Sequence, residues 1–277
     1  MNKIVRGVLD VLLFIIVFYV IQYFVTVGVA AAAAWHNGEA WSSFSTRLMH
    51  GRFGMSGKML VGTSVLSSIL TMIVFIYRRW AEVSRVWLAS HPWITLIWVI
   101  FMALGTILPS QWLQDQMDLA MPDGMVKIFE TIMGEPMGYL AIGILAPLAE
   151  ELVFRGAILR TLLKLFAPKL HWIPIILSAV IFGALHGNLA QFVHASIIGL
   201  ILGWMFYRTN SIAPGVVFHW INNTVAYLMF NLMPQMADGK LIDLFHGDSR
   251  TMWLGLAFSL CLLIPSFFQL HLRLKRN

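Results

Sequence analysis

Long apolar stretches alternate with short polar segments along almost the entire chain. Eight runs approach or exceed the length of a membrane span, at 8–34, 59–77, 93–109, 137–161, 172–187, 191–207, 212–233 and 252–270. A helix needs about 20 apolar residues to cross a bilayer. The pattern therefore predicts an all-α fold, a polytopic membrane helix bundle of about eight transmembrane helices.

Composition supports the same class. Of 277 residues, 59% are hydrophobic and only 12% are charged, whereas about a quarter of the residues in a soluble domain are charged. No internal repeat or flexible linker divides the chain, so we expect a single membrane domain, 1–277, in a lipid bilayer. The formal net charge of +6 comes from basic residues scattered at helix ends, which argues against a nucleic-acid partner.

Basic residues predict the orientation, because cytoplasmic loops of membrane proteins are enriched in Lys and Arg. With the N-terminus inside, twelve basic residues are cytoplasmic and six are external. The cytoplasmic set is Lys3, Arg6, Arg78, Arg79, Arg85, Arg160, Lys164, Lys169, Arg208, Arg273, Lys275 and Arg276. Both termini are then cytoplasmic, as in a multi-pass protein of a bacterial plasma membrane. The first run also resembles a signal peptide, but it is longer than a usual signal core.

One external segment, 122–136, has helical rather than spanning character. Its apolar residues recur at helical spacing opposite a polar face that contains Lys127 and Glu130. This pattern predicts a short amphipathic helix on the outer membrane surface. It is either a packed loop helix or a lid over a substrate site.

Two adjacent carboxylates occur inside the fourth run, in the sequence Ala149-Glu150-Glu151-Leu152-Val153-Phe154-Arg155. Ionisable residues inside a membrane are costly and usually functional. Glu151 and Arg155 are four residues apart in the order that favours a helical ion pair. Glu150 points about 100° away and has no partner on its own helix. Because a low dielectric disfavours its charged form, Glu150 is the candidate general base.

Histidines and an asparagine lie in later runs. Phe182 and His186 are four residues apart near the end of the fifth run, and His219 and Asn223 are four apart in the seventh. Residues at this spacing share a helix face. His194, in the sixth run, lies near the outer interface, so we expect an interfacial residue rather than a further member of the site.

These three motifs, Glu-Glu-x-x-x-Arg, Phe-x-x-x-His and His-x-x-x-Asn on successive helices, resemble the CPBP family. That family contains the CAAX prenyl endopeptidases and their bacterial relatives, the bacteriocin-processing and immunity proteins. The resemblance covers about 137–235, which is the expected catalytic core.

The resemblance implies an intramembrane endopeptidase that acts on membrane-associated or lipidated protein or peptide substrates. Glu150 would activate a water, His186 would orient it or support the oxyanion, and His219 with Asn223 would complete the oxyanion site. Glu151, Arg155 and Phe182 would support these groups. A reaction without a cofactor is favoured, because Asn is a poor zinc ligand and no His-Glu-x-x-His occurs. Zinc held by Glu150, His186 and His219 remains the alternative.

Two other classes of function stay open on the sequence alone. Buried Glu, His and Arg also occur in transporters and proton relays, although the repeat common in transporters is missing. A non-catalytic membrane scaffold that retains the motifs for packing is the second alternative. A hydrolysis assay separates the protease from both.

Overall fold

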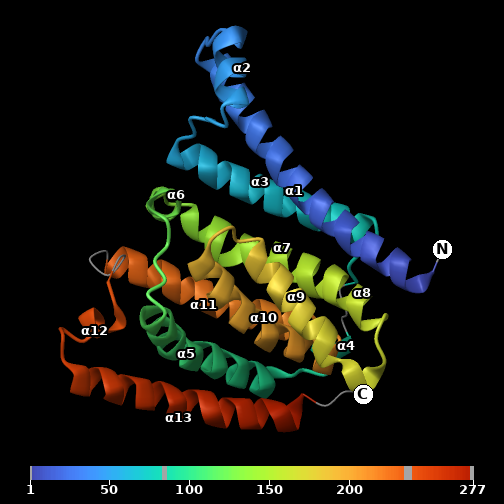
Figure 1. The fold of residues 1–277 in the computed structure, drawn as a ribbon, viewed down its shortest axis with the longest axis vertical. Coiled ribbons are helices and arrows are strands. Elements are labelled where there is room, and N and C mark those ends of the chain that lie inside the picture. Colours follow the sequence, from blue (N-terminus) through green and yellow to red (C-terminus); the bar gives the residue numbers. More distant parts are fainter. Residues whose placement is uncertain (1, 83–85, 234–238, 275–277) are drawn as a thin grey trace.

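The computed structural model describes residues 2–82, 86–233 and 239–274, and the regular structure in these ranges is entirely helical (Figure 1). Its long helices are α1 (Lys3–His36), α3 (Gly57–Tyr77), α5 (Trp93–Gln116), α9 (Trp172–Ala184), α10 (Leu189–Thr209), α11 (Ala213–Leu232) and α13 (Ser249–Arg273). The short ones are α2 (Trp41–Met49), α4 (Val86–Ala89), α6 (Asp123–Met133), α12 (Leu241–Leu244) and the 3₁₀ turn η3 (Pro168–Leu170).

The fourth apolar run forms one continuous helical stretch, here called the central helix. It consists of the π-helical segment η1 (Tyr139–Leu145), then α7 (Ala146–Glu151), the π-helical segment η2 (Leu152–Leu159) and α8 (Arg160–Leu163). Pro147 has no N–H to donate, so one hydrogen bond of the regular α ladder is missing at this position. The wide turns of η1 end at Leu145, two residues before this proline. Such π segments are frequent at functional sites.

Each predicted apolar run lies largely in a helix, although the fifth run was expected to reach residue 187 and α9 ends at Ala184. In its described ranges the protein is an all-helical integral membrane protein. Among the described residues, five helices are long and apolar enough to cross a membrane: α1, α3, α5, α10 and α13. The central helix is divided by π turns, α9 has only 13 residues, and α11 carries several polar side chains. The total of eight spans therefore stays a prediction.

Some helices in the structure end at other residues than the sequence predicted. The third run was expected to end at Pro109, but α5 continues through this proline to Gln116, as membrane helices often do. The segment 122–136 contains the expected helix, α6 (Asp123–Met133). Arg85, Lys275 and Arg276 lie outside the described residues, as do 234–235 at the end of the expected core.

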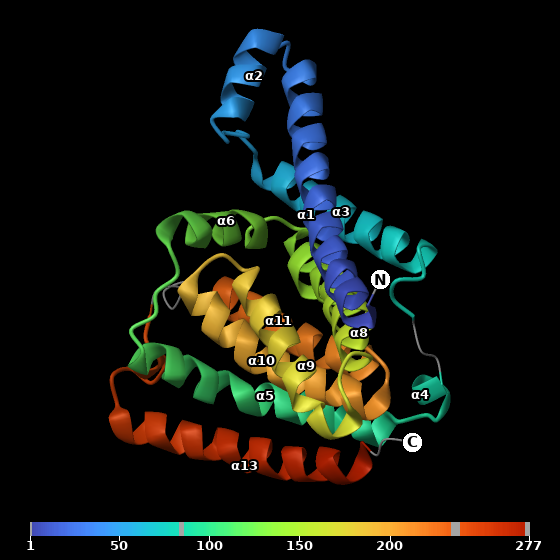
Figure 2. The same ribbon diagram turned by 45° about the vertical axis from the view of Figure 1, so that its right-hand side comes forward.

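The helices are arranged in successive layers around the central helix (Figures 1 and 2). Helices α1 and α3 pack together on one side of the central helix. Helices α9, α10 and α11 pack on its other side, and α5 pairs with α13 beyond them. The central helix is thus enclosed by other helices, and its residues 152–159 are all buried.

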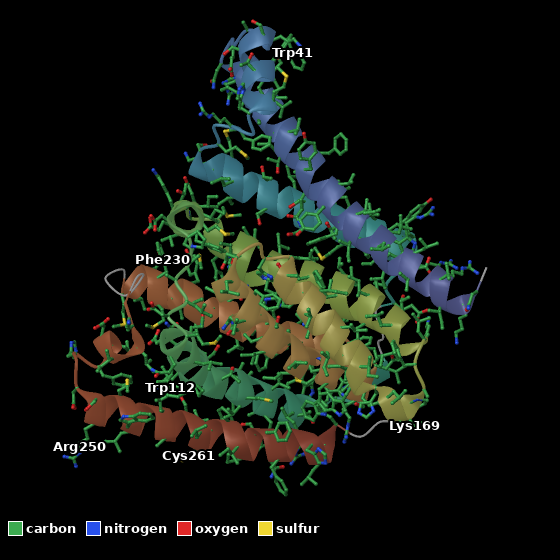
Figure 3. The ribbon with its side chains drawn as sticks, in the orientation of Figure 1. Trp41, Trp112, Lys169, Phe230, Arg250 and Cys261 are labelled. Carbon is green, nitrogen blue, oxygen red and sulfur yellow. The ribbon has the colours of Figure 1, made fainter. Side chains whose placement is uncertain are left out.

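Helix α1 projects well beyond this bundle. Its 34 residues span about 51 Å, compared with about 30 Å for the hydrocarbon core of a bilayer. Its end packs against α2 through Ala30, Ala34 and Phe44, and the resulting hairpin stands away from the other helices (Figure 2). Trp41 lies near the far end of this hairpin (Figure 3).

Candidate active site

Glu151 and Arg155 form the predicted ion pair in the interior of the bundle. The distance from Arg155 Nη1 to Glu151 Oε1 is 2.7 Å, and the two side chains are 0% and 1% exposed. Arg155 also donates through Nη2 to the carbonyl oxygen of Gly199 on α10, at 3.5 Å. Its guanidinium carbon lies 4.4 Å from the centre of the Phe182 ring. The pair therefore connects the central helix to α9 and α10.

Two glycines allow neighbouring helices to approach this pair closely. A Cβ added at Gly215 on α11 would lie 2.5 Å from Glu151 Oε2, and one at Gly199 would lie 3.4 Å from Arg155 Nη2. Small residues commonly permit close helix contacts in membranes. The sequence motifs did not identify either glycine as part of the site.

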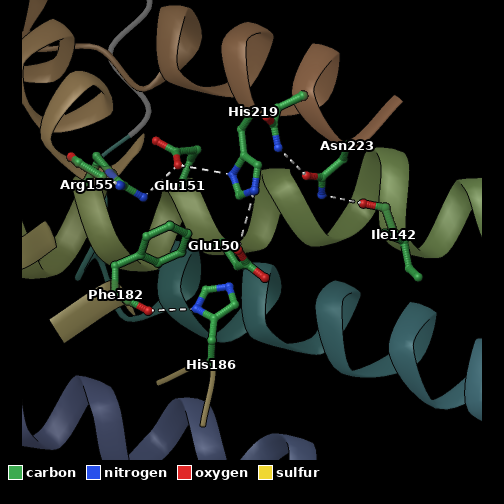
Figure 4. Close-up of polar contacts among 10 residues, drawn as sticks. Ile142, Glu150, Glu151, Arg155, Phe182, His186, His219 and Asn223 are labelled. Atoms are coloured by element: carbon green, nitrogen blue, oxygen red, sulfur yellow. Dashed lines mark hydrogen bonds and ion pairs between the residues drawn. The ribbon is translucent and has the colours of Figure 1, made fainter. Parts of the chain in front are cut away.

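Glu150 has a different environment from its neighbour, with its side chain 24% exposed. His219 lies between the two carboxylates: its Nε2 is 3.8 Å from Glu150 Oε2, and its Nδ1 is 3.4 Å from Glu151 Oε1 (Figure 4). The structure thus brings the fourth and seventh apolar runs together at the residues that the motifs selected.

A cavity of about 90 Å³ lies against Glu150, between α1, α3 and α7. Its polar lining consists of Gln22, Ser64, Ser67, Ser68, Thr71 and Glu150. Sequence reasoning missed this lining, because it found no motif in the first three apolar runs. The available signal was the helical spacing of the four hydroxyl residues on α3.

His186 lies in the turn after α9, just beyond the end of the helix at Ala184. Its Nδ1 is 2.8 Å from the carbonyl oxygen of Phe182. A carbonyl only accepts, so Nδ1 carries the proton and the Nε2 of a neutral ring has a free lone pair. The Phe182 ring lies 5.0 Å from the His186 ring and 5.9 Å from the His219 ring, so it packs against both imidazoles.

The turn that holds His186 has a defined local cause. Gly187 adopts a positive φ of 75°, which glycine tolerates without strain. Asn188 then caps α10 by accepting a hydrogen bond from the backbone N–H of Gln191, at 2.9 Å. The chain therefore reverses immediately after His186.

Asn223 faces the central helix from α11. Its Nδ2 donates to the carbonyl oxygen of Ile142 in η1, at 3.0 Å, and its Oδ1 accepts from Asn222 Nδ2, at 3.4 Å. A carboxamide nitrogen has two N–H donors. One of them holds α11 against η1, and the second is available to a ligand.

His194 on α10 has a polar partner inside the bundle. Its Nδ1 lies 2.7 Å from the hydroxyl oxygen of Ser110 on α5, and its ring is close enough to His186 and His219 to interact electrostatically. This arrangement favours the view of His194 as a neighbour of the site over an isolated interfacial residue.

The side chains as placed do not form a ready zinc site. Within the part of the chain that the structure describes, no three His, Cys, Asp or Glu side chains are grouped so that they could hold a metal ion. Zinc binding by Glu150, His186 and His219 would require these side chains to move closer together.

Apolar helices that enclose a cluster of ionisable side chains define an integral membrane protein with a polar site in its interior. Residues 133–225, about a third of the chain, match the family described as type II CAAX prenyl endopeptidase, Rce1-like. This match confirms, for this part of the chain, the resemblance to the CPBP family that the motifs indicated. No curated protein and no solved structure matches the chain.

Proposed function

We propose that this protein is an intramembrane endopeptidase of the CAAX-protease type that uses Glu150, without a metal, to activate water. One observation carries the proposal: two adjacent carboxylates have opposite environments. Glu151 is fully buried and paired with Arg155, whereas Glu150 is partly exposed beside a cavity and His219. A general base must reach the proton that it takes, and a carboxylate beside a cavity, outside a buried ion pair, can do so.

The reaction begins with proton transfer from water to the Glu150 carboxylate. The water oxygen adds to the carbonyl carbon of the scissile bond, and the carbonyl oxygen takes the negative charge. The C–N bond then breaks, and the protonated Glu150 returns its proton to the leaving nitrogen. The products are a carboxylic acid and an amine, so the enzyme is regenerated unchanged.

The other residues position the reactants. The free Nε2 of His186 accepts a hydrogen bond from the attacking water and orients it. The second N–H of Asn223, together with His219, donates to the oxyanion. Donors aimed at a developing charge are worth several kcal/mol in a site from which water is excluded.

The substrate is a membrane-associated or lipidated protein or peptide. The position of Glu150 inside the helix bundle of a membrane protein supports this substrate class. We further propose that both termini are cytoplasmic and that the membrane is a bacterial plasma membrane, on the basis of the basic residues at the helix ends.

Mass spectrometry of new N-termini in membrane proteins tests the proposal. Cells that express the wild type should accumulate cleavage products that disappear with Glu150→Gln at equal protein level. Glu130→Gln, on an exposed face of α6, is the matched control and should behave as the wild type. Identical products with all three proteins would reject the protease and favour a scaffold or a transporter.

A further inference from the structure

The α3 face of the cavity beside Glu150 is unusually polar for a membrane helix. Ser64, Ser67, Ser68 and Thr71 are spaced i, i+3, i+4 and i+7, so they occupy one face of α3 and all line the cavity. Together they are called the hydroxyl face. Gln22 contributes a further polar group from α1.

Thr71 indicates that this face binds something. It is 0% exposed, and its hydroxyl has no hydrogen-bond partner among the described residues. Ser67, by contrast, donates to the carbonyl oxygen of Ser64, at 3.1 Å. Leaving a buried hydroxyl unpaired is unfavourable, so the position of Thr71 on the cavity wall points to a small polar ligand.

Water fits the cavity in both size and chemistry. A water molecule occupies about 30 Å³ in the liquid and is held in proteins by two to four polar partners. The cavity of about 90 Å³ therefore has room for very few waters. A water that accepts a hydrogen bond from one of these hydroxyls can donate one proton to Glu150 and the other to His186 Nε2, and its second lone pair stays free for attack.

We propose that the hydroxyl face of α3 holds the water that supplies Glu150, with Thr71 and Ser68 as positioning residues for that water. This inference rests on the proposed function for its catalytic part, because Glu150 is the group that consumes the water. It explains how a hydrolase surrounded by apolar helices keeps its second substrate at the carboxylate.

The kinetic test compares two threonines of α3. Thr71→Val removes the hydroxyl without changing the shape of the side chain, and it should lower kcat on the order of 10- to 100-fold with little change in KM. Thr71→Ser should restore kcat. Thr63 is the control, because its hydroxyl is also buried and unpaired but does not line the cavity; Thr63→Val should retain the kcat of the wild type.

Hydration is measured independently of activity by radiolytic labelling in ¹⁸O water. Phe18 lines the cavity, whereas Phe14, one turn earlier in α1, packs against Phe75 and Trp80. Bound water should give ¹⁸O labelling of Phe18 above that of Phe14. This excess should fall in Thr71→Val and Ser68→Ala but not in Thr63→Val.

The outcomes distinguish this inference from the proposed function. Equal labelling of Phe18 and Phe14, an unchanged kcat in Thr71→Val, or no rescue by Thr71→Ser would overturn the hydroxyl-face proposal. A rise in KM at constant kcat would overturn it in favour of a pocket for a substrate side chain. If Phe18 is labelled as expected but Glu150→Gln keeps its activity, the water site is supported and the role of Glu150 as the base is rejected.

Discussion

The two sides of the central helix differ in what surrounds their carboxylates. On the side of α9, α10 and α11, Glu151 is enclosed, paired with Arg155 and approached by Gly215. On the side of α3, Glu150 borders a cavity lined by hydroxyls. Two identical residues, adjacent in the chain, thus have different environments: Glu151 is paired inside the bundle, and Glu150 is placed for the catalytic role proposed above. Neighbouring packing, rather than residue type, makes this difference.

The largest loss of activity is expected from a change at Glu150, on the side of the central helix that borders the cavity. Glu150→Gln keeps the shape of the side chain but removes the base, so turnover should fall by roughly 10²- to 10⁴-fold. The midpoint of thermal unfolding should change little. Both are measured on purified protein in detergent, by peptide cleavage and by thermal unfolding. A large loss of stability would show that Glu150, like Glu151, helps to hold the bundle together.

At the enclosed side, the main effect should be on stability. Glu151→Gln leaves Arg155 as an unpaired buried charge, which should destabilise the protein by about 3–5 kcal/mol. The yield of monodisperse protein and its unfolding in denaturant measure this effect. The double variant Glu151→Gln/Arg155→Met removes both charges and should recover much of the loss. If the single variant were as stable as the wild type, the two sides would not differ as described.

Asn223 combines a structural contact with a proposed catalytic one: it holds α11 to η1, and in the proposed mechanism it donates to the oxyanion. Asn223→Ala should reduce turnover on the order of a hundredfold, as measured by kcat in the cleavage assay. Asn222→Ala, which removes only the donor to Asn223 Oδ1, should have a much smaller effect. Equal losses in the two variants would argue for a packing role alone.

A partly exposed ion pair provides a contrast to the buried pair of Glu151 and Arg155. Arg47 donates to Glu39 through Nε and Nη2, at 2.9 Å and 2.6 Å, and the hydrogen bond from Arg47 lowers the pKa of Glu39 below its usual value of 4.5. The contribution of this pair to stability is therefore full above pH 4.5 and is lost as the pH falls through the lowered pKa.

Hydrogen exchange of the α2 amides should report this pair. At neutral pH, residues 41–49 should exchange faster in Glu39→Gln than in the wild type. The factor should be small, because ion pairs that water can reach contribute little to stability. The difference should vanish once the pH falls below the pKa of Glu39. Equal exchange at neutral pH would show that the pair does not hold the hairpin.

Chelation should have the smallest effect of all. If Glu150 acts without a metal, activity should survive exhaustive treatment with a chelator, and elemental analysis should find less than stoichiometric zinc. Activity that is lost on chelation and restored by zinc alone would instead make Glu150, His186 and His219 metal ligands. The cavity side would then be a metal site.

Much of the helical framework could be predicted because it depends on local pattern. Apolar length predicted all eight helical runs, and spacing of four residues predicted the pairing of Glu151 with Arg155. The same rule placed His219 and Asn223 on one face, and both contact the central helix in the structure.

The rest of the candidate site depends on packing between helices distant in sequence. Neither the approach of Gly215 to Glu151 nor the partner of His194 on α5 follows from any local pattern. The sequence shows the helical spacing of the four hydroxyl residues on α3. Only the structure shows that they line a cavity beside Glu150. The π turns were not predicted either, because the wide ladder has no distinct hydrophobic pattern.

The π turns of the central helix also constrain how such a chain can diverge. In η2 (Leu152–Leu159), bonding from i to i+5 accommodates more residues per turn than an α ladder. Deleting one residue between Glu151 and Arg155 would separate them by three positions and rotate every later residue about the axis. Substitutions in this stretch change one contact, whereas insertions and deletions change the whole register. Alignments of related chains should therefore run without gaps from Glu150 to Leu159, even where residue identities vary.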